Sequence, residues 1–146
     1  MLTFSRRVTI EWQHCDPAGI VFYPRYFAMF DTSTTMLVER TLGMSKYQLL
    51  KKYDFLGYPM VETRSRFMLP TRFGDEVEIK TTLIEVKHSS FTVEHQILKA
   101  GELAVEGRDT RVWVVTDPAN PDKFKPRPIP PEVIAKLTAQ AGLCAQ

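Results

Sequence analysis

Cysteine is scarce in this sequence. Only two of the 146 residues are cysteines, Cys15 and Cys144, and they stand toward opposite ends of the chain with no framework spacing. A chain of this length buries enough apolar surface to fold without disulfides or a structural metal. We therefore interpret both residues as free thiols in a reducing compartment, which excludes a small disulfide-stapled secreted domain.

Long hydrophobic runs are absent as well. No segment approaches the roughly 18 apolar residues of a membrane helix, and residues 1–11 alternate instead of forming the apolar block of a secretory leader. The formal net charge of +2 is too small to indicate nucleic-acid binding by itself. We expect a single cytoplasmic domain over residues 1–146, with neither a membrane nor a nucleic acid as partner.

The spacing of apolar residues changes along the chain and predicts its secondary structure. Apolar residues alternate over Phe4–Trp12, as in a half-buried strand. From Pro24 the spacing becomes helical, because proline suits the first helical position and an apolar stripe continues to Leu42. Gly43 is placed to end this long helix. A shorter helix is expected over Ser45–Tyr53.

The remainder of the chain predicts strands followed by a short helix. Four strands are expected, over Met60–Leu69, Glu76–Lys87 (with a bulge after Leu83), Phe91–Lys99 and Leu103–Thr116. The proline-rich segment 117–131 is expected to be irregular, and Pro131–Ala141 to form a terminal helix. Four large aromatic residues are predicted to lie in the core: Trp12, Phe67, Phe91 and Trp113.

This order of elements predicts an α+β domain. Hairpin-connected strands indicate an antiparallel sheet, and the long helix packs on one face of it. One helix covers only one face, so the other face and the free strand edges are expected to meet a second subunit.

The chemistry is concentrated in the segment Asp16–Pro24, which reads DPAGIVFYP. Asp16, Pro17 and Gly19 are typical of a β-turn in which the carboxylate bonds nearby backbone N–H groups, and this purely structural interpretation stays open. The functional interpretation is that a carboxylate precedes a helix N-terminus, whose free N–H groups suit a developing oxyanion. Because Pro24 has no N–H, the amide of Tyr23 is the candidate donor.

The same nine residues resemble the active-site motif of the 4-hydroxybenzoyl-CoA thioesterase branch of the hotdog-fold acyl-CoA thioesterases. The resemblance extends over Val8–Val115 and implies a five-stranded antiparallel sheet wrapped around a long central helix. It implies hydrolysis of an acyl-CoA, with an aryl or short-to-medium acyl group, to free acid and CoA. Asp16 would act as nucleophile or general base, and the Tyr23 amide would polarise the thioester carbonyl. The site would lie between the subunits of a homodimer, itself part of a homotetramer, and no cofactor would be needed.

The resemblance further implies a set of substrate-binding residues: Gly19, Phe22 and Pro24 in the motif, Asp31 on the helix, Tyr58 and Pro59 in a pocket-lining loop, and Lys87, His88 and Ser89 at a strand turn that grips the CoA phosphates. This turn has fewer cations than the family pattern, and Lys123, Lys125 and Arg127 are either a replacement or a solvated proline-rich tail. Asp31 is either buried, with Thr35 or a substrate hydroxyl as partner, or a solvated helix carboxylate.

Several alternatives stay open. His14 and Cys15 immediately precede Asp16, but adjacent residues of an extended chain point in opposite directions, so neither a metal site nor a cysteine nucleophile is expected. His95 is expected to be structural, and so is His88 if it does not bind phosphate. A hydratase or dehydratase on the same fold would rely on a histidine near the helix, and residues 26–43 contain none. A non-catalytic acyl-CoA-binding protein is disfavoured by the intact Asp16 motif.

Overall fold

The computed structural model describes residues 1–139 and 142–144. Its centre is a sheet in which five antiparallel strands follow the order β2-β5-β4-β3-β1. Their bounds are β1 Thr3–Thr9, β2 Met60–Phe67, β3 Glu76–Val86, β4 Ser90–Lys99 and β5 Glu102–Val112. The predicted α+β class and the five antiparallel strands are confirmed. A short sixth strand, β8 (Gly142–Cys144), pairs in parallel with β1 and was not expected.

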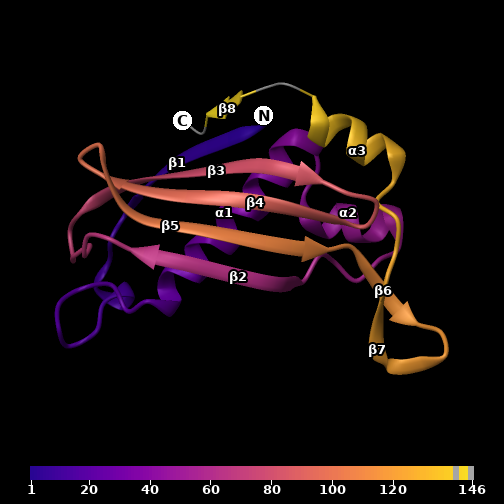
Figure 1. Ribbon diagram of the computed structural model, residues 1–146, viewed down its shortest axis with the longest axis horizontal. Helices are drawn as coiled ribbons and strands as arrows, with labels where there is room; N and C mark the ends of the chain where they lie inside the picture. The colour runs from indigo at the N-terminus through magenta and orange to yellow at the C-terminus, as the bar shows by residue number, and fades with distance from the viewer. Residues whose placement is uncertain (140–141, 145–146) are drawn as a thin grey trace.

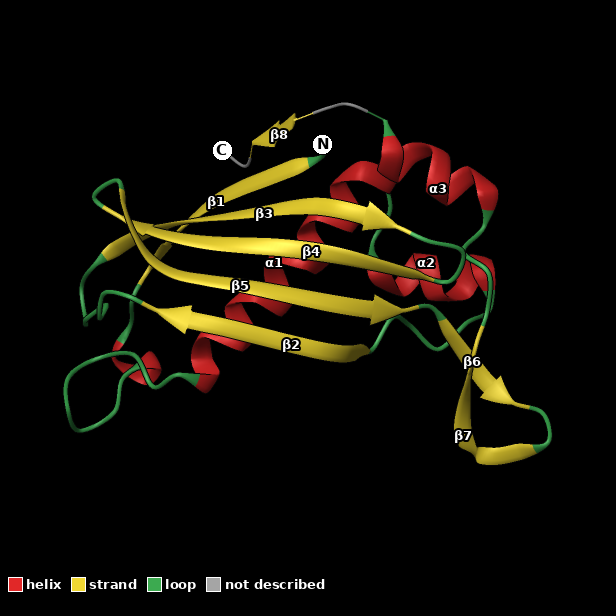
Figure 2. Ribbon diagram, in the orientation of Figure 1, coloured by secondary structure: helices red, strands yellow, loops and turns green. Residues whose placement is uncertain are grey.

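The long helix α1 (Pro24–Leu42) packs on one face of the sheet and crosses it diagonally (Figures 1 and 2). It begins at Pro24 and is closed by Gly43, as predicted. The helix α2 (Lys46–Tyr53) starts from Ser45, whose side chain accepts the N–H of Gln48, and α3 is Pro131–Thr138. Within the described residues, no helix has both the length and the apolar character needed to cross a membrane.

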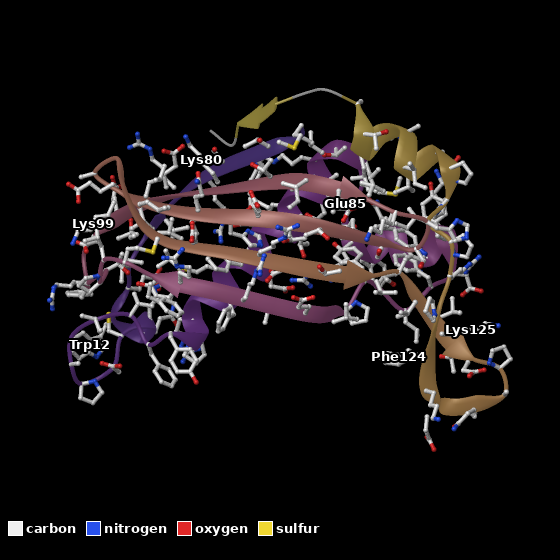
Figure 3. All side chains as sticks on the ribbon, viewed as in Figure 1. Trp12, Lys80, Glu85, Lys99, Phe124 and Lys125 are labelled. Atoms are coloured by element: carbon white, nitrogen blue, oxygen red, sulfur yellow. The ribbon has the colours of Figure 1, made fainter. Side chains whose placement is uncertain are left out.

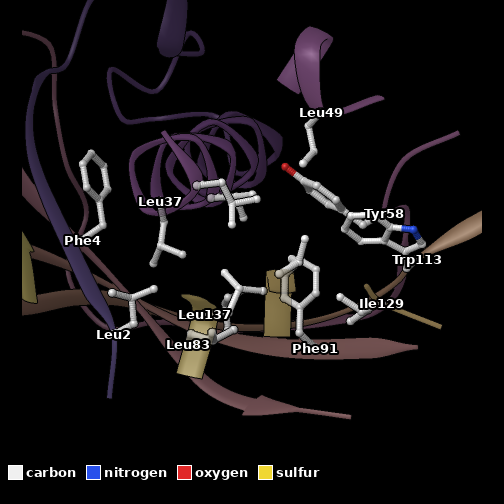
Figure 4. Packing of buried hydrophobic residues seen from close by; sticks show 14 of the residues in the cluster. Leu2, Phe4, Leu37, Leu49, Tyr58, Leu83, Phe91, Trp113, Ile129 and Leu137 are labelled. Carbon is white, nitrogen blue, oxygen red and sulfur yellow. The ribbon is translucent and has the colours of Figure 1, made fainter. Parts of the chain in front are cut away.

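The core lies between α1 and the sheet and divides into two clusters. The larger one includes Leu37, Leu83, Phe91 and Trp113, with the ring of Tyr58 wedged among them and its hydroxyl directed toward α1 (Figure 4). The second, around Phe30, lies under the first half of α1. Burying each such large side chain stabilises the fold by about 1.5–3 kcal/mol.

Gly107 on β5 sets how closely α1 approaches the sheet. A Cβ atom at this position would lie only 2.8 Å from Cε2 of Phe30. The absent side chain lets Phe30 settle on the sheet, where its ring stacks on His95 at 4.4 Å. This contact anchors the middle of α1 above β4 and β5.

Two of the predicted core aromatics are not in the core of the chain. Phe91 and Trp113 are buried as expected, but Trp12 is 69% exposed and Phe67 is 52% exposed. β1 ends at Thr9, and the 3-10 helix η1 (Trp12–His14) breaks the alternation on which the Trp12 prediction rested. Phe67 ends the edge strand β2, where its ring packs against Tyr26 and stays about half exposed.

The proline-rich segment is more regular than expected. Strands β6 (Val114–Asp117) and β7 (Asn120–Pro126) form a hairpin that projects from the end of β5 (Figure 1). The expectation of an irregular chain over 117–131 therefore does not hold for residues 120–126. A two-stranded hairpin has a free edge on each strand, and prolines are tolerated there.

The sheet face turned away from α1 is polar. Ion pairs cross between its strands, from Arg66 to Glu106 at 3.5 Å and from Arg108 to Glu94 at 3.9 Å. Exposed pairs of this kind add little stability. That a second subunit covers this face stays a prediction.

Candidate active site

Asp16 lies at the tip of a short hairpin between β1 and α1. Its N–H donates to the carbonyl of Ile20 (3.1 Å), and its own carbonyl accepts the N–H of Gly19 (2.9 Å). Oδ1 of the carboxylate accepts the N–H of Ala18 at 2.8 Å. Gly19 has φ +80°, a region that glycine enters without steric cost. The predicted turn is confirmed, and it fixes a half-buried carboxylate whose Oδ2 has no partner within the described residues.

Thr71 holds this hairpin and the start of α1 together. Its carbonyl accepts the N–H of Val21 at 2.9 Å, and its hydroxyl bonds the hydroxyl of Tyr26 on the first turn of α1. Thr71 is fully buried, and burial raises the pKa of Tyr26, so the phenol stays neutral. Sequence reasoning missed Thr71, because it lies 45 residues beyond Tyr26 and carries no local motif.

The N-terminus of α1 presents a free amide. The N–H groups of Arg25 and Tyr26 bond back to the carbonyls of Phe22 and Tyr23, at 2.8 and 3.1 Å. Pro24 has no N–H, and no acceptor for the N–H of Tyr23 is present in the part of the chain that the structure describes. A helix N-terminus with an unpaired N–H stabilises a negative charge that lies close to it.

His14 and Cys15 are both tied to the backbone of Glu11. Nδ1 of His14 accepts the N–H of Glu11 at 2.8 Å, and the Cys15 thiol donates to the Glu11 carbonyl at 3.7 Å. This use of Nδ1 removes that nitrogen as a base for the thiol. Residues 1–139 and 142–144 contain no group of three or more metal-ligating side chains. Cys15 is a free thiol, and the side chain of Cys144 lies outside the described part.

Apart from Asp31 on α1, the predicted site residues fall into two groups at opposite ends of the sheet. Asp16, Gly19 and Phe22 through Pro24 lie at the end where β1 leads into α1, near Trp12 in Figure 3. Tyr58, Pro59 and the turn Lys87–Ser89 lie at the other end, beside α2 (Figure 1). Tyr58 is buried, and burial raises its pKa to about 12. One chain alone does not bring these two groups together.

The turn between β3 and β4 is firmly held but weakly cationic. The carbonyls of Ser89 and His88 accept the N–H groups of Trp113 and Ile129, both at 2.8 Å. Lys87 is exposed and lies 3.6 Å from Glu85. Arg127 is tied to the end of α2, because its Nη1 donates to the carbonyls of Tyr53 and Asp54.

Asp31 has a partner that sequence reasoning did not find. Its side chain is 52% exposed, and Oδ1 lies 2.8 Å from Nη2 of Arg111, which is only 5% exposed. Asp31 is thus an exposed helix carboxylate, the second of the two alternatives, and its partner is Arg111 and not Thr35. Arg111 shares strand parity with the buried Gly107 and Asp109 of β5, and this alternation was the available signal that its side chain points inward.

Arg111 belongs to a polar network buried between the sheet and α1. Asp109 accepts hydrogen bonds from Thr63 at 2.7 Å and from Nε2 of His95 at 3.1 Å, and lies 3.9 Å from Arg111. The Thr81 hydroxyl donates to Nδ1 of His95 at 2.8 Å. Burial lowers the pKa of His95 although Asp109 opposes this. Burial works to raise the pKa of Asp109, but the hydrogen bonds from His95 and Thr63 outweigh it and lower the pKa.

The neutral state of His95 predicts a pH-dependent stability. The unfolded chain takes up a proton near the ordinary value of 6.5, whereas the folded chain resists it. The contribution of His95 is therefore fully present above pH 6.5 and is lost as the pH falls below it, by at most about 1.4 kcal/mol per pH unit. Urea unfolding between pH 7.5 and 5 measures this slope. We expect His95→Gln to flatten it, whereas substitution of the exposed His88 by Gln leaves it as in the wild type.

Comparison with known proteins agrees with this architecture. A model of the thioesterase-like superfamily matches residues 10–137. A 4-hydroxybenzoyl-CoA thioesterase from Pseudomonas sp. (strain CBS-3) is 25% identical over 122 residues, which are 80% of this chain and 84% of that protein. The acyl-CoA thioester hydrolase YbgC of Escherichia coli O6:H1 is 22% identical over 134 residues, 92% of this chain and 95% of the relative.

Solved structures give the same result. A gentisyl-coenzyme A thioesterase superposes with a TM-score of 0.77 at 32% identity, covering 89% of this chain and 98% of that one. The structure of the Pseudomonas 4-hydroxybenzoyl-CoA thioesterase has a TM-score of 0.82 at 24% identity, with coverages of 92% and 98%. The resemblance seen in the sequence is confirmed, and the chain belongs to the thioesterase-like superfamily.

Proposed function

We propose that this protein hydrolyses acyl-CoA thioesters to the free acid and CoA, with a preference for aromatic acyl groups. The names of two relatives specify such groups, 4-hydroxybenzoyl and gentisyl. The proposal is carried by one observation: the rigid turn that holds Asp16 leads directly into a helix whose first amide, that of Tyr23, is unpaired.

The chemistry needs only these two groups. The Tyr23 N–H donates to the thioester oxygen, and this bond strengthens as the oxygen becomes an oxyanion, a contribution of about 3 kcal/mol. The Asp16 carboxylate either attacks the carbonyl carbon, so that CoA leaves as the thiolate and water hydrolyses the resulting anhydride, or takes a proton from the water that attacks. Because a thiolate leaves readily, no metal or organic cofactor is required.

The complete site requires two copies of the chain. β2 is an edge strand whose one partner among the described residues is β5, and Val61 on it is 63% exposed. An unpaired edge is a template for another strand. Antiparallel pairing of two β2 strands about a twofold axis places the Asp16 end of one copy beside the Lys87–Ser89 end of the other. The homodimer, its assembly into a homotetramer, phosphate binding by Lys87, His88 and Ser89, and a cytoplasmic location are parts of this proposal.

A substrate panel tests the activity. Release of free thiol is measured with benzoyl-CoA, 4-hydroxybenzoyl-CoA and aliphatic acyl-CoAs of increasing length, with and without a chelator. We expect turnover of at least one aryl ester that the chelator leaves unchanged. Hydration of an enoyl-CoA without thiol release would instead support the hydratase alternative, and binding without turnover would support a non-catalytic role.

Subunit complementation tests the shared site. Asp16→Asn removes the carboxylate, and Lys87→Ala removes the cation at the far turn. In a mixed dimer of the two variants, one of the two sites keeps both groups, so the mixture is expected to recover activity that each variant lacks at low substrate concentration. If mixing restores nothing although native mass spectrometry shows mixed dimers, Asp16 and Lys87 do not serve one site across the interface.

A further inference from the structure

The linker between β2 and β3, residues 68–75, is held at both of its ends. Where it leaves β2, the N–H groups of its first two residues donate to the carbonyl of Ala104 on β5, at 2.8 and 3.1 Å. Where it enters β3, Asp75 Oδ2 lies 2.8 Å from Nζ of Lys99 at the end of β4 and accepts the N–H of Arg72, also at 2.8 Å. The linker therefore has a fixed position relative to the sheet.

One residue of this linker contacts both halves of the proposed site. The first half is the hairpin that carries Asp16, and the second is the start of α1 with the amide of Tyr23. The carbonyl of Thr71 accepts the N–H of Val21 in the hairpin at 2.9 Å. The Thr71 hydroxyl bonds the hydroxyl of Tyr26 in the first turn of α1. Asp16 and the Tyr23 amide come from different elements, so their separation depends on how these two elements are held together.

The bond between the two hydroxyls is shielded from water. Thr71 and Tyr26 are both buried, and a buried hydroxyl that loses its partner is destabilising, so each hydroxyl holds the other in place. The chain that joins the hairpin directly to α1 consists of Phe22 and Tyr23, which are both exposed. The packing of these two residues therefore contributes little to the angle at which the hairpin meets the helix.

We infer that Thr71 is a positioning residue for thioester hydrolysis, because by binding Val21 and Tyr26 together it sets the separation between Asp16 and the Tyr23 amide. This inference rests on the proposed function and adds to it a buried residue that acts through its neighbours. A misplacement of about 1 Å costs up to about 10²-fold in rate. Loss of the hydroxyl pair is expected to lower kcat by about tenfold and to leave KM within about threefold, since geometry and not binding is changed.

Isosteric substitutions separate positioning from stability. Thr71→Val and Tyr26→Phe each leave one buried hydroxyl without a partner, so each is expected to lower both kcat and the melting temperature. The double variant leaves no hydroxyl unpaired and is expected to regain most of the melting temperature while kcat stays about tenfold below the wild type. Thr71→Ser keeps the hydroxyl and is expected to retain kcat within about twofold. Thermal unfolding and thiol release from the best aryl ester of the panel are measured for all four variants.

A hydroxyl pair at the other end of the sheet provides a matched control. Thr92 on β4 bonds Thr110 on β5 at 3.2 Å, and Thr92→Val is expected to leave kcat as in the wild type. If kcat of the double variant returns to the wild-type value together with its stability, Thr71 only stabilises the fold and the inference is overturned. Undiminished kcat in Thr71→Val, with turnover that still depends on Asp16, would also overturn it while leaving the proposed function intact. Absence of wild-type turnover on every ester would overturn the proposed function and this inference with it.

Discussion

Replacement of Asp16 by Asn is expected to lower kcat for acyl-CoA hydrolysis by about 10²–10⁴-fold, the usual contribution of a positioned acid or base. The side-chain oxygen of Asn still accepts the N–H of Ala18, so the turn keeps its shape. The amide neither attacks a carbonyl carbon nor takes a proton from water. Chemistry is therefore lost while binding remains, and KM is expected to change much less than kcat.

The chain contains a matched control for this substitution. Asp117, in the hairpin of β6 and β7, accepts the N–H of Ala119 at 2.9 Å in the same local arrangement that Asp16 makes with Ala18. Asp117→Asn repeats the same chemical change far from α1 and is expected to leave kcat unaltered. Thermal unfolding of both variants should match the wild type. Full turnover in a folded Asp16→Ala protein would remove Asp16 from the mechanism.

The parts of this fold that depend on local sequence were predictable. The bounds of α1 follow from a proline at its first position and a glycine after its last, and the turn at Asp16 follows from the conformational preferences of four adjacent residues. The bulge expected after Leu83 is present as a register shift between Leu83 and Glu85. Each of these features depends on residues that are adjacent in the sequence, so one sequence is enough to predict it.

The features that were missed depend on contacts between distant residues. The bond of Thr71 to Tyr26 and the pair of Arg111 with Asp31 join positions 45 and 80 residues apart. Nothing in the sequence near Asp31 points to Arg111. Trp12 was misplaced because one short 3-10 turn after β1 shifts it off the core face. The polar residues of β5 show that strand parity predicts the direction of a side chain but not its partner.

Asp109 is where the largest loss of stability is expected. Its carboxylate is 1% exposed, accepts hydrogen bonds from Thr63 and His95, and lies beside Arg111. Asp109→Ala leaves the Nε2–H of His95 unpaired and leaves the buried Arg111 with Asp31 alone. Removing one partner of a buried charge pair costs about 3–5 kcal/mol, far more than the net value of the pair. Urea unfolding at pH 7.5 is expected to show this decrease in the free energy of unfolding.

Two further variants distinguish the cost of leaving a buried charge unpaired from the cost of losing one contact. Glu94→Ala removes a carboxylate from an exposed pair on the outer face of the sheet and is expected to change stability by less than about 1 kcal/mol. Replacing the whole buried set with apolar residues of similar volume (His95→Phe, Asp109→Leu and Arg111→Met) leaves no buried charge unpaired, since Asp31 is exposed, and is expected to restore most of the stability that Asp109→Ala loses. If this triple variant is as unstable as Asp109→Ala, the network holds α1 on the sheet through its specific polar contacts. Restored stability would instead show that the fold does not need these charges.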